Sequence, residues 1–437
     1  MTSTKSNYKS AFLFITILFF LWGFITVLVD SLIPRLKDVF EMSYGRTILV
    51  QSAFFIAFFI VSLPAGKLLS KIGYKNGIIA GLLTMATGCL LFYPASAYRN
   101  FNVFIVGYFT LASGITILQV AANPYVSLLG SEKGASSRLN LSQAFNSLGT
   151  TIAPIIGALF LLSSSVKSSA EINLLTEAEK LNYYAEEAGT VQVPFLAIAI
   201  FIGLLALLFY FIKLPSVVEK SPRQGYTELL KNKKLLLGAL GIFVYVGAEV
   251  AIGSSFLVNY FESMNLSVIV ANNGHMMSIA NTIADVFNHS FSNSDPRSLL
   301  GIFITFYWGG AMIGRFVGSY LTRILSPGKV LSFFALLAIC MILTSILTVG
   351  LVSMWSILAV GLFNSIMFPT IFSLSLEGLG NLKSQASGIL CMAIVGGAVV
   401  PFIFGNIIDS YGFKIAFIFT ITCYAYISFY GYYKSKN

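Results

Sequence analysis

Two acidic side chains lie inside long apolar segments of the chain, where an ionisable group is costly and therefore marks a candidate functional site. Asp30 lies toward the end of the first such segment, and Glu249 lies deep in the seventh. Burial disfavours the charged form of a carboxyl group, so a buried acid can carry a proton near neutral pH. Its oxygens equally suit sodium, since hard cations prefer oxygen ligands. We therefore expect Asp30 and Glu249 to couple a cation, either proton or sodium; a structural ion pair with Arg35 or Arg315 is the alternative.

Amide side chains form a second group of candidates. Gln119 and Asn123 are four residues apart, and Gln143 and Asn146 are three apart, so each pair shares one face of a helix. Amides both donate and accept hydrogen bonds, as recognition of sugar hydroxyls requires. Hydrogen bonding between helices, worth about 0.6 kcal/mol per bond on average, is the alternative. Asn364 is a further substrate-binding candidate from the second half of the chain.

Aromatic residues make up 14% of the chain, and four of them lie on segments that we expect to line a central cavity. These are Trp22, Tyr245, Tyr307 and Trp308. A ring face can stack on a sugar ring, and Tyr245 is included among the candidate substrate-binding residues. Packing in the core or at the membrane interface is the alternative for each ring.

The elements that must position these residues are transmembrane helices. Of the 437 residues, 57% are hydrophobic and only 10% are charged, whereas a soluble domain carries about a quarter charged residues. A spanning helix needs roughly 20 mostly apolar residues, and twelve segments qualify. They begin near Ala11, Thr47, Asn76, Asn102, Ser137, Val191, Leu235, Ser298, Val330, Met354, Ser384 and Lys414. The sequence therefore predicts an all-α membrane protein surrounded by lipid.

Basic residues predict the orientation in the membrane. Lys and Arg are concentrated in the polar stretch 213–234, in the loop after the second segment and in the C-terminal tail, whereas the loop between segments five and six is acidic. Because positive charge is retained on the cytoplasmic side, we expect both termini and the middle loop to be cytoplasmic. The same bias accounts for the net charge of +10, so nucleic acid is not an expected partner.

The two halves of the chain repeat each other. Residues 66–72 (GKLLSKI) match 318–324 (GSYLTRI), at an offset of about 250 residues, and Asn123-Pro124 corresponds to Phe368-Pro369. Parallel six-helix halves around a midplane site are the architecture of major facilitator transporters. We expect halves at 1–213 and 235–437 joined by the cytoplasmic loop 214–234. The matching loops are the expected gates, with the residues Gly66, Lys71, Gly318 and Arg323; a short turn whose lysines only follow the cytoplasmic charge bias is the alternative.

Four longer motifs carry a specific resemblance. Residues 119–125 (QVAANPY), 143–150 (QAFNSLGT), 245–250 (YVGAEV) and 361–370 (GLFNSIMFPT) are similar to the bacterial glucose/galactose transporters, a branch of the fucose:proton symporter family within the major facilitator superfamily. This resemblance implies a secondary active transporter of the bacterial inner membrane. It would take up a hexose by cation symport with alternating access.

The resemblance also assigns roles to individual residues. The acid on helix one of the fucose symporters matches Asp30, and their helix-five amides match Gln143 and Asn146. Their helix-four Glu falls on Gln119, so its role is not transferred, and Glu249 is the acid that this branch has instead. Two departures are Val29, where an Asn is common, and a segment near 263–297 that is longer than usual and includes both histidines. A short helix over the outer mouth is expected there.

Other functions remain as alternatives at this point. The substrate could be an N-acetylhexosamine or another sugar, and the same fold supports efflux by antiport. An enzyme is not expected, since no nucleophile–base pair and no metal-ligand spacing occurs. We expect a monomer surrounded by lipid, with no cofactor other than the coupling ion and no metal site.

Overall fold

The long apolar segments form helices, because a helix satisfies every backbone polar group within its own segment. The computed structural model describes residues 2–30, 44–161, 172, 174–215, 225–286 and 296–436, among which no strand occurs. The first half contains α1 (Thr2–Asp30), α3 (Tyr44–Ala97), α4 (Phe101–Leu128), η1 (Glu132–Gly134), α5 (Ala135–Leu161) and α7 (Glu177–Phe211).

The second half is more segmented. It contains α8 (Gly225–Leu229), α9 (Lys233–Ile252), α10 (Ser255–Ser263), α11 (Leu266–Ala271), α12 (Gly274–Val286), α13 (Pro296–Ile324), α14 (Pro327–Leu347), α15 (Gly350–Asn364), α16 (Met367–Ser375), η2 (Gly380–Leu382), α17 (Lys383–Met392), η3 (Ala393–Val395), α18 (Gly396–Tyr411) and α19 (Phe413–Lys436). The pairs α15–α16 and α17–α18 each make one crossing, with a local interruption of the helix.

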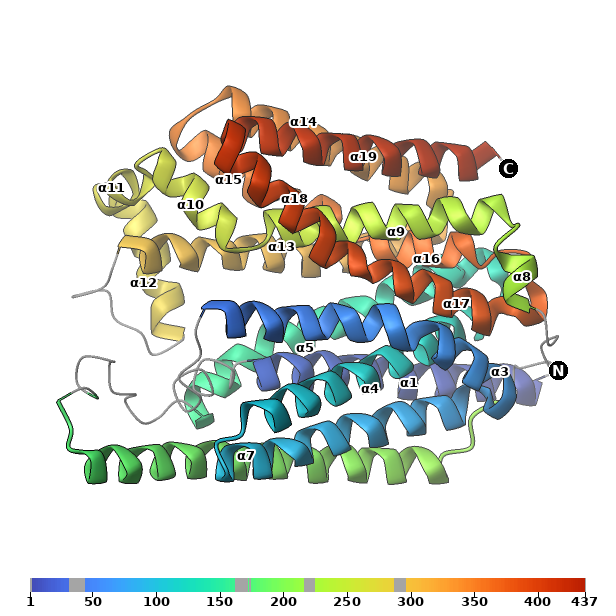
Figure 1. Ribbon diagram of the computed structural model, residues 1–437. Helices are drawn as coiled ribbons and strands as arrows, with labels where there is room; N and C mark the ends of the chain where they lie inside the picture. Colours follow the sequence, from blue (N-terminus) through green and yellow to red (C-terminus); the bar gives the residue numbers. More distant parts are fainter. Residues whose placement is uncertain are drawn as a thin grey trace.

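Twelve membrane crossings result, as the sequence predicts. Ten helical stretches among the described residues are long and apolar enough to span a membrane. One of them, α3, makes two crossings, because it turns back at Gly73, where φ is 81° and ψ is 168° (Figure 1). The remaining crossing is α5, whose 27 residues exceed the roughly 20 that a bilayer requires. The predicted all-α fold is confirmed.

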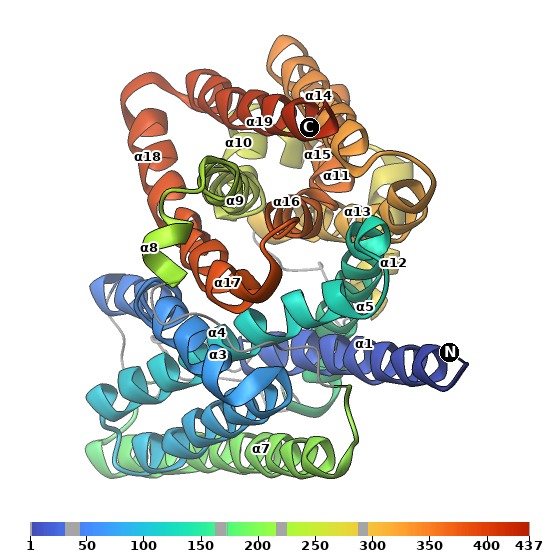
Figure 2. The same ribbon diagram turned by 90° about the vertical axis from the view of Figure 1, so that its right-hand side faces the viewer.

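The helices form two groups that meet along a central interface (Figure 2). In the first group α3 packs on α4 and α7, and α1 packs on α5; in the second, α14 packs on α19 and α15, and α9 packs on α18. Across the interface α5 contacts α13 and α16, and α17 contacts α3 and α4. These crossing helices position the side chains of the site.

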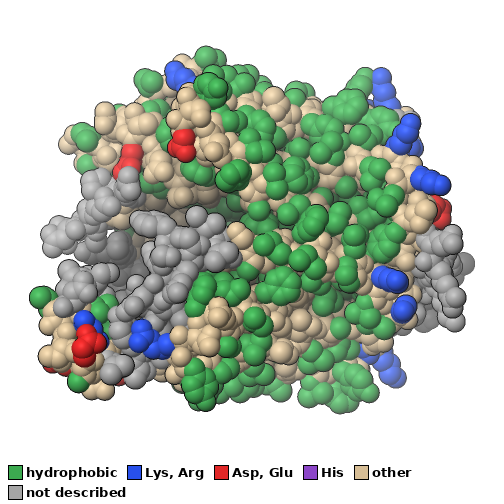
Figure 3. All heavy atoms as spheres, in the orientation of Figure 1, with side chains coloured by type: hydrophobic (Ala, Val, Ile, Leu, Met, Phe, Trp, Pro, Cys, Tyr) green, Lys and Arg blue, Asp and Glu red, His purple; other side chains and the backbone are tan. Residues whose placement is uncertain are grey.

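Both termini lie at the same end of the molecule, together with α8 (Figure 1). We call this the terminal end. On the face that Figure 3 shows, many hydrophobic side chains cover the surface between the two ends, and Lys and Arg gather at the edge of the terminal end. The apolar band is the surface that lipid would cover.

The long segment after Glu262 contains two short helices, α11 and α12, and α10 ends at its start. The expectation was a single short external helix, but α10, α11 and α12 follow the end of α9 and pack against α13. Met276, Ala280 and Ala284 are buried at intervals of four residues along α12, whereas His275 is exposed. His289 lies outside the described residues.

Candidate functional site

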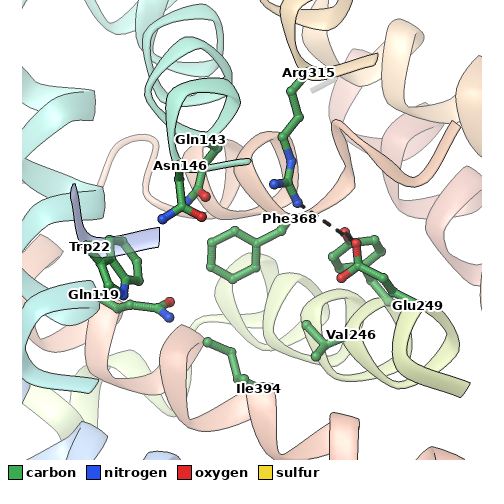
Figure 4. A pocket seen from close by; sticks show the side chains of 10 residues that line it. Trp22, Gln119, Gln143, Asn146, Val246, Glu249, Arg315, Phe368 and Ile394 are labelled. Atoms are coloured by element: carbon green, nitrogen blue, oxygen red, sulfur yellow. Dashed lines mark hydrogen bonds and ion pairs between the residues drawn. The ribbon is translucent and has the colours of Figure 1, made fainter. Parts of the chain in front are cut away.

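A polar cavity of about 160 Å³ lies between the two groups of helices (Figure 4). We call its first side the amide wall: Trp22 of α1, Gln119 of α4, and Gln143 and Asn146 of α5. We call the second side the charged wall: Tyr245, Val246 and Glu249 of α9, Arg315 of α13, Phe368 of α16 and Ile394 of η3. The cavity therefore combines residues that are up to 372 positions apart in the chain.

The amide wall is held by hydrogen bonds behind the cavity. The Gln143 Nε2 donates to the Asn123 Oδ1 at 3.2 Å, and Asn123 is fully buried. The Asn146 Nδ2 donates to the backbone oxygen of Phe19 at 2.9 Å. The side chain of Gln119 makes no hydrogen bond to another described residue. The amides that remain open can donate to a neutral polar ligand and accept from it.

Two glycines place this wall by bringing α1 close to α5. A Cβ on Gly23 would collide with the backbone of Asn146, and one on Gly149 would collide with the backbone oxygen of Phe20. Small residues allow helices in a membrane to approach this closely. The close approach is what brings the Asn146 amide within hydrogen-bonding distance of the backbone of α1.

The charged wall is organised around Glu249. The Tyr245 hydroxyl donates to the Glu249 Oε1 at 2.6 Å, and the Tyr307 hydroxyl donates to the Glu249 backbone oxygen at 3.1 Å. Behind them the Asn364 Nδ2 donates to the Tyr307 hydroxyl at 2.5 Å. The Arg315 Nη2 lies 3.9 Å from the Glu249 Oε1. The buried carboxylate thus accepts a hydrogen bond from Tyr245 on its own helix and has one cation nearby, while Tyr307 of α13 binds the backbone of the same residue.

Arg315 also contacts the other group of helices. Its Nη1 donates to the Ser147 hydroxyl of α5, and its Nε donates to the backbone oxygen of Ser365 at 3.1 Å. The side chains of Arg315 and Glu249 are only 15% and 12% exposed. The guanidinium group of Arg315 therefore lies between the Glu249 carboxylate and the opposite half of the molecule.

The candidates identified from the sequence take three kinds of position. Gln119, Gln143, Asn146, Tyr245 and Glu249 line the cavity. By contrast Asn123 and Asn364 are fully buried behind it, where they hold Gln143 and Tyr307. The side chain of Asp30 and the whole of Arg35 lie outside the described residues.

The aromatic candidates are also divided. Trp22 and Tyr245 line the cavity, whereas Tyr307 is buried behind it. Trp308 is 42% exposed and does not line the cavity. Ring candidates on one helix thus face different environments.

Sequence reasoning missed three apolar lining residues, Val246, Phe368 and Ile394, and considered Arg315 only as an ion-pair partner. Arg315 carried a usable signal, because it is a charged residue in an apolar segment. Phe368 and Ile394 carried none, since nothing distinguishes them from the many other apolar residues of the chain.

The four expected gating residues separate into glycines at helix contacts and exposed basic residues. A Cβ on Gly66 would lie 2.6 Å from the Tyr226 hydroxyl and 3.0 Å from the backbone oxygen of Ser384, at the contact of α3 with α17. A Cβ on Gly318 would collide with the side chain of Ile366. Lys71 and Arg323 are exposed. Both glycines permit close packing of neighbouring elements, and the expected gating role of the four residues stays a prediction.

Polar contacts join the two groups of helices at the terminal end, and we call these contacts the seam. They are Ser136 with Ser373 at 2.6 Å, Ser137 with the backbone oxygen of Ser319 at 2.7 Å, Asn140 with Thr370 at 3.1 Å, Ser387 with the backbone oxygen of Val120 at 2.8 Å, and Glu132 with Lys383 at 3.0 Å. The seam joins the two groups of helices between the cavity and the terminal end.

Glu132 is the charged member of the seam. Its Oε1 accepts from the Lys383 Nζ at 3.0 Å and from the backbone N–H of Gly378 at 3.3 Å. The Lys383 hydrogen bond, above all, holds the pKa of the Glu132 carboxyl below its ordinary value. The carboxylate is therefore ionised at neutral pH.

Comparison with known proteins places this arrangement among membrane transporters. The sequence profile of the Major Facilitator Superfamily matches residues 11–400. The glucose/galactose transporter of Brucella abortus is 47% identical over 100% of this chain and 97% of its own length. The putative glucose/galactose transporter of Helicobacter pylori is 43% identical, with 97% of each chain covered.

The similarity to more distant relatives also covers nearly the whole chain. The L-fucose-proton symporter of Escherichia coli is 32% identical over 99% of this chain and 94% of its own. The crystal structure of the major facilitator transporter FucP in the outward conformation superposes with a TM-score of 0.86, at 30% identity, over 98% of this chain and 99% of that one. The similarity therefore extends over both groups of helices.

Proposed function

The chain belongs to the major facilitator superfamily, and on this basis we propose that it takes up a hexose by cation symport. Relatives named as glucose/galactose transporters and as L-fucose-proton symporters support this proposal, because they match the chain over nearly its whole length. The substrate would be of the glucose or galactose type.

The observation that carries the proposal is the composition of the two walls. Three neutral amides and Trp22 face Glu249 and Arg315 across one cavity of about 160 Å³. Pockets for drug-sized ligands usually measure about 300–1,000 Å³, so a small polar solute fits better than a drug. Amides match hydroxyls that both donate and accept, and the Trp22 ring can cover an apolar face of the sugar. Efflux of apolar compounds is correspondingly disfavoured.

Glu249 is the proposed coupling residue among the described side chains, and Asp30, whose side chain lies outside them, is the second proposed coupling residue. One oxygen of Glu249 is bound by Tyr245, and Oε2 makes no hydrogen bond to any described residue. That oxygen can bind a proton or contribute to a sodium site. The coupling ion is therefore proposed as one of these two.

Alternating access would use the seam. A closed terminal end fits the similarity to a structure in the outward conformation, so we propose that the terminal end is cytoplasmic and that the protein resides in the bacterial inner membrane. The halves 1–213 and 235–437 would rock about the substrate, with 214–234 as the connecting loop. We propose that the protein acts as a monomer in lipid and translocates the sugar without chemical change.

Uptake by purified protein in proteoliposomes tests the proposal. Labelled glucose, galactose, fucose and N-acetylglucosamine are each supplied under an inward proton gradient and, separately, under an inward sodium gradient. We expect accumulation of glucose or galactose with one of the two gradients, and none in protein-free vesicles. Accumulation of N-acetylglucosamine alone would favour the alternative sugar. Failure of every sugar to exchange across the membrane would overturn the proposed function.

A further inference from the structure

Arg315 is the one cation among the described residues that line the cavity, and each of its three guanidinium nitrogens contacts a different group. Within one guanidinium group, Nε binds the backbone oxygen of Ser365 between α15 and α16, Nη1 binds Ser147 of the opposite half, and Nη2 approaches Glu249. The fork of an arginine presents several donors in a fixed plane, so these contacts constrain one another.

The contact with Glu249 is weaker than the other two. At 3.9 Å it is an ion pair but not a hydrogen bond, which would be about 2.7–3.2 Å long. The near oxygen of Glu249 is occupied by Tyr245 at 2.6 Å instead. The guanidinium therefore neutralises the carboxylate without being committed to it, and a cation bound at Glu249 can replace it.

We propose that Arg315 competes with the coupling cation for Glu249 and that its bond to Ser147 links this competition to the contact between the two halves. Without the cation, Arg315 neutralises the carboxylate. With the cation bound, Arg315 is held by Ser147 and Ser365 alone. This inference rests on the proposed function, in which Glu249 binds the cation, and it adds the residue that regulates that binding.

The surroundings of Glu249 contain no second cation that could take this role. The ionisable side chains that face it are Tyr245 on its own helix, Tyr307 and Arg315 on α13, and Tyr424 on α19. A tyrosine side chain carries no positive charge in either of its protonation states. Arg315 is therefore the charged group, among the described residues, that opposes cation binding at Glu249.

Direct measurement of cation binding tests the proposal without sugar. Sodium-22 retention and proton uptake are measured on the purified full-length protein and on its variants. We expect R315Q to lower the half-saturating cation concentration about tenfold, because a positive charge next to a carboxylate opposes a second cation by at least this factor. R315K, which keeps the charge, should stay within about threefold of the wild type. R99Q, a change of the same kind far from the cavity, serves as the control.

The link to the opposite half predicts a shift of opposite sign. In S147A, Arg315 loses its hydrogen-bond partner on α5, so its guanidinium should interact more with Glu249. The half-saturating cation concentration should then rise about threefold, which is the size of effect expected from the loss of one hydrogen bond. In R315Q/S147A the serine substitution should have no further effect on cation binding, because the arginine through which Ser147 acts is already absent. The double-mutant cycle formed by these variants measures the coupling between the two residues.

Two results would overturn the proposal: cation binding by R315Q that equals that of the wild type, or an S147A effect that persists in R315Q/S147A. If R315Q fails to fold, E249Q/R315Q removes both charges at once, and the proposal then requires the double variant to fold and to exchange hexose. A folded wild type that binds the cation but exchanges no sugar would contradict the proposed function and leave the role of Arg315 standing.

Discussion

The two walls of the cavity differ in charge, and each comes from a different half of the chain. The amide wall has three neutral amides and one indole, whereas the charged wall has a carboxylate and a guanidinium among aromatic and aliphatic side chains. Gln143 and Asn146 lie on α5 of the first half, whereas η3 of the second half contributes only the apolar Ile394. One wall therefore suits a neutral polar solute and the other suits a cation.

The largest expected effect is on the charged wall. In E249Q we expect sugar accumulation under an ion gradient to fall to simple equilibration, because the amide cannot bind the cation, while exchange of labelled for unlabelled hexose continues. Proteoliposome uptake and counterflow measure the two activities. E228Q, a change of an acid on α8 away from the cavity, should behave as the wild type.

D30N refines this comparison, because Asp30 belongs to the half that carries the amide wall. Loss of accumulation in both D30N and E249Q would mean that coupling uses both halves. Full accumulation in E249Q, with loss in D30N alone, would place coupling in the first half and break the division between the walls.

The next largest effect concerns the amide wall. In Q143A we expect hexose affinity to fall about 10- to 100-fold, because the substitution removes a contact and leaves the buried Asn123 Oδ1 without its donor. The half-saturating cation concentration should not change. Binding of labelled hexose and of the cation to the same preparation measures both, with Q192A on α7 as the matched control. A shift in cation binding would show that the walls do not act separately.

The smallest effect is expected at the seam, which belongs to neither wall. Lys383 holds the pKa of Glu132 below its ordinary value, so the pair is intact above the usual carboxyl pKa of about 4.3 and is lost only as the pH falls through the lowered value. Between pH 6 and 8 the pair should not titrate. In E132Q, exchange rates should change by no more than about fivefold, since exposed ion pairs contribute about 0–1 kcal/mol.

The measurement is hexose exchange between pH 6 and 8 in E132Q and the wild type. Any pH dependence in this range should persist in E132Q, because it originates at the cavity. A profile that becomes flat in E132Q would assign the pH dependence to the seam and remove the charged wall as its source.

Much of the site could be anticipated from local patterns. The spacing of Gln143 and Asn146 predicted a common face, and the isolation of Glu249 in an apolar segment marked it as a candidate. Asn123 and Asn364 had the same kind of signal, yet they lie behind the cavity. A spacing rule identifies the face of a helix, but not the depth at which each residue meets a neighbouring helix.

The sequence by itself determined the class of protein. It contains twelve apolar segments, each long enough to cross a bilayer. Inside lipid such a segment forms a helix, because a helix pairs the backbone N–H and C=O groups within the segment itself. Tertiary structure alone decided which side chains meet. Arg315 lies 66 residues after Glu249 and 168 after Ser147, yet it contacts both. That contact depends on how α13 packs against α9 and α5, and packing of this kind is a property of surfaces that no local pattern contains.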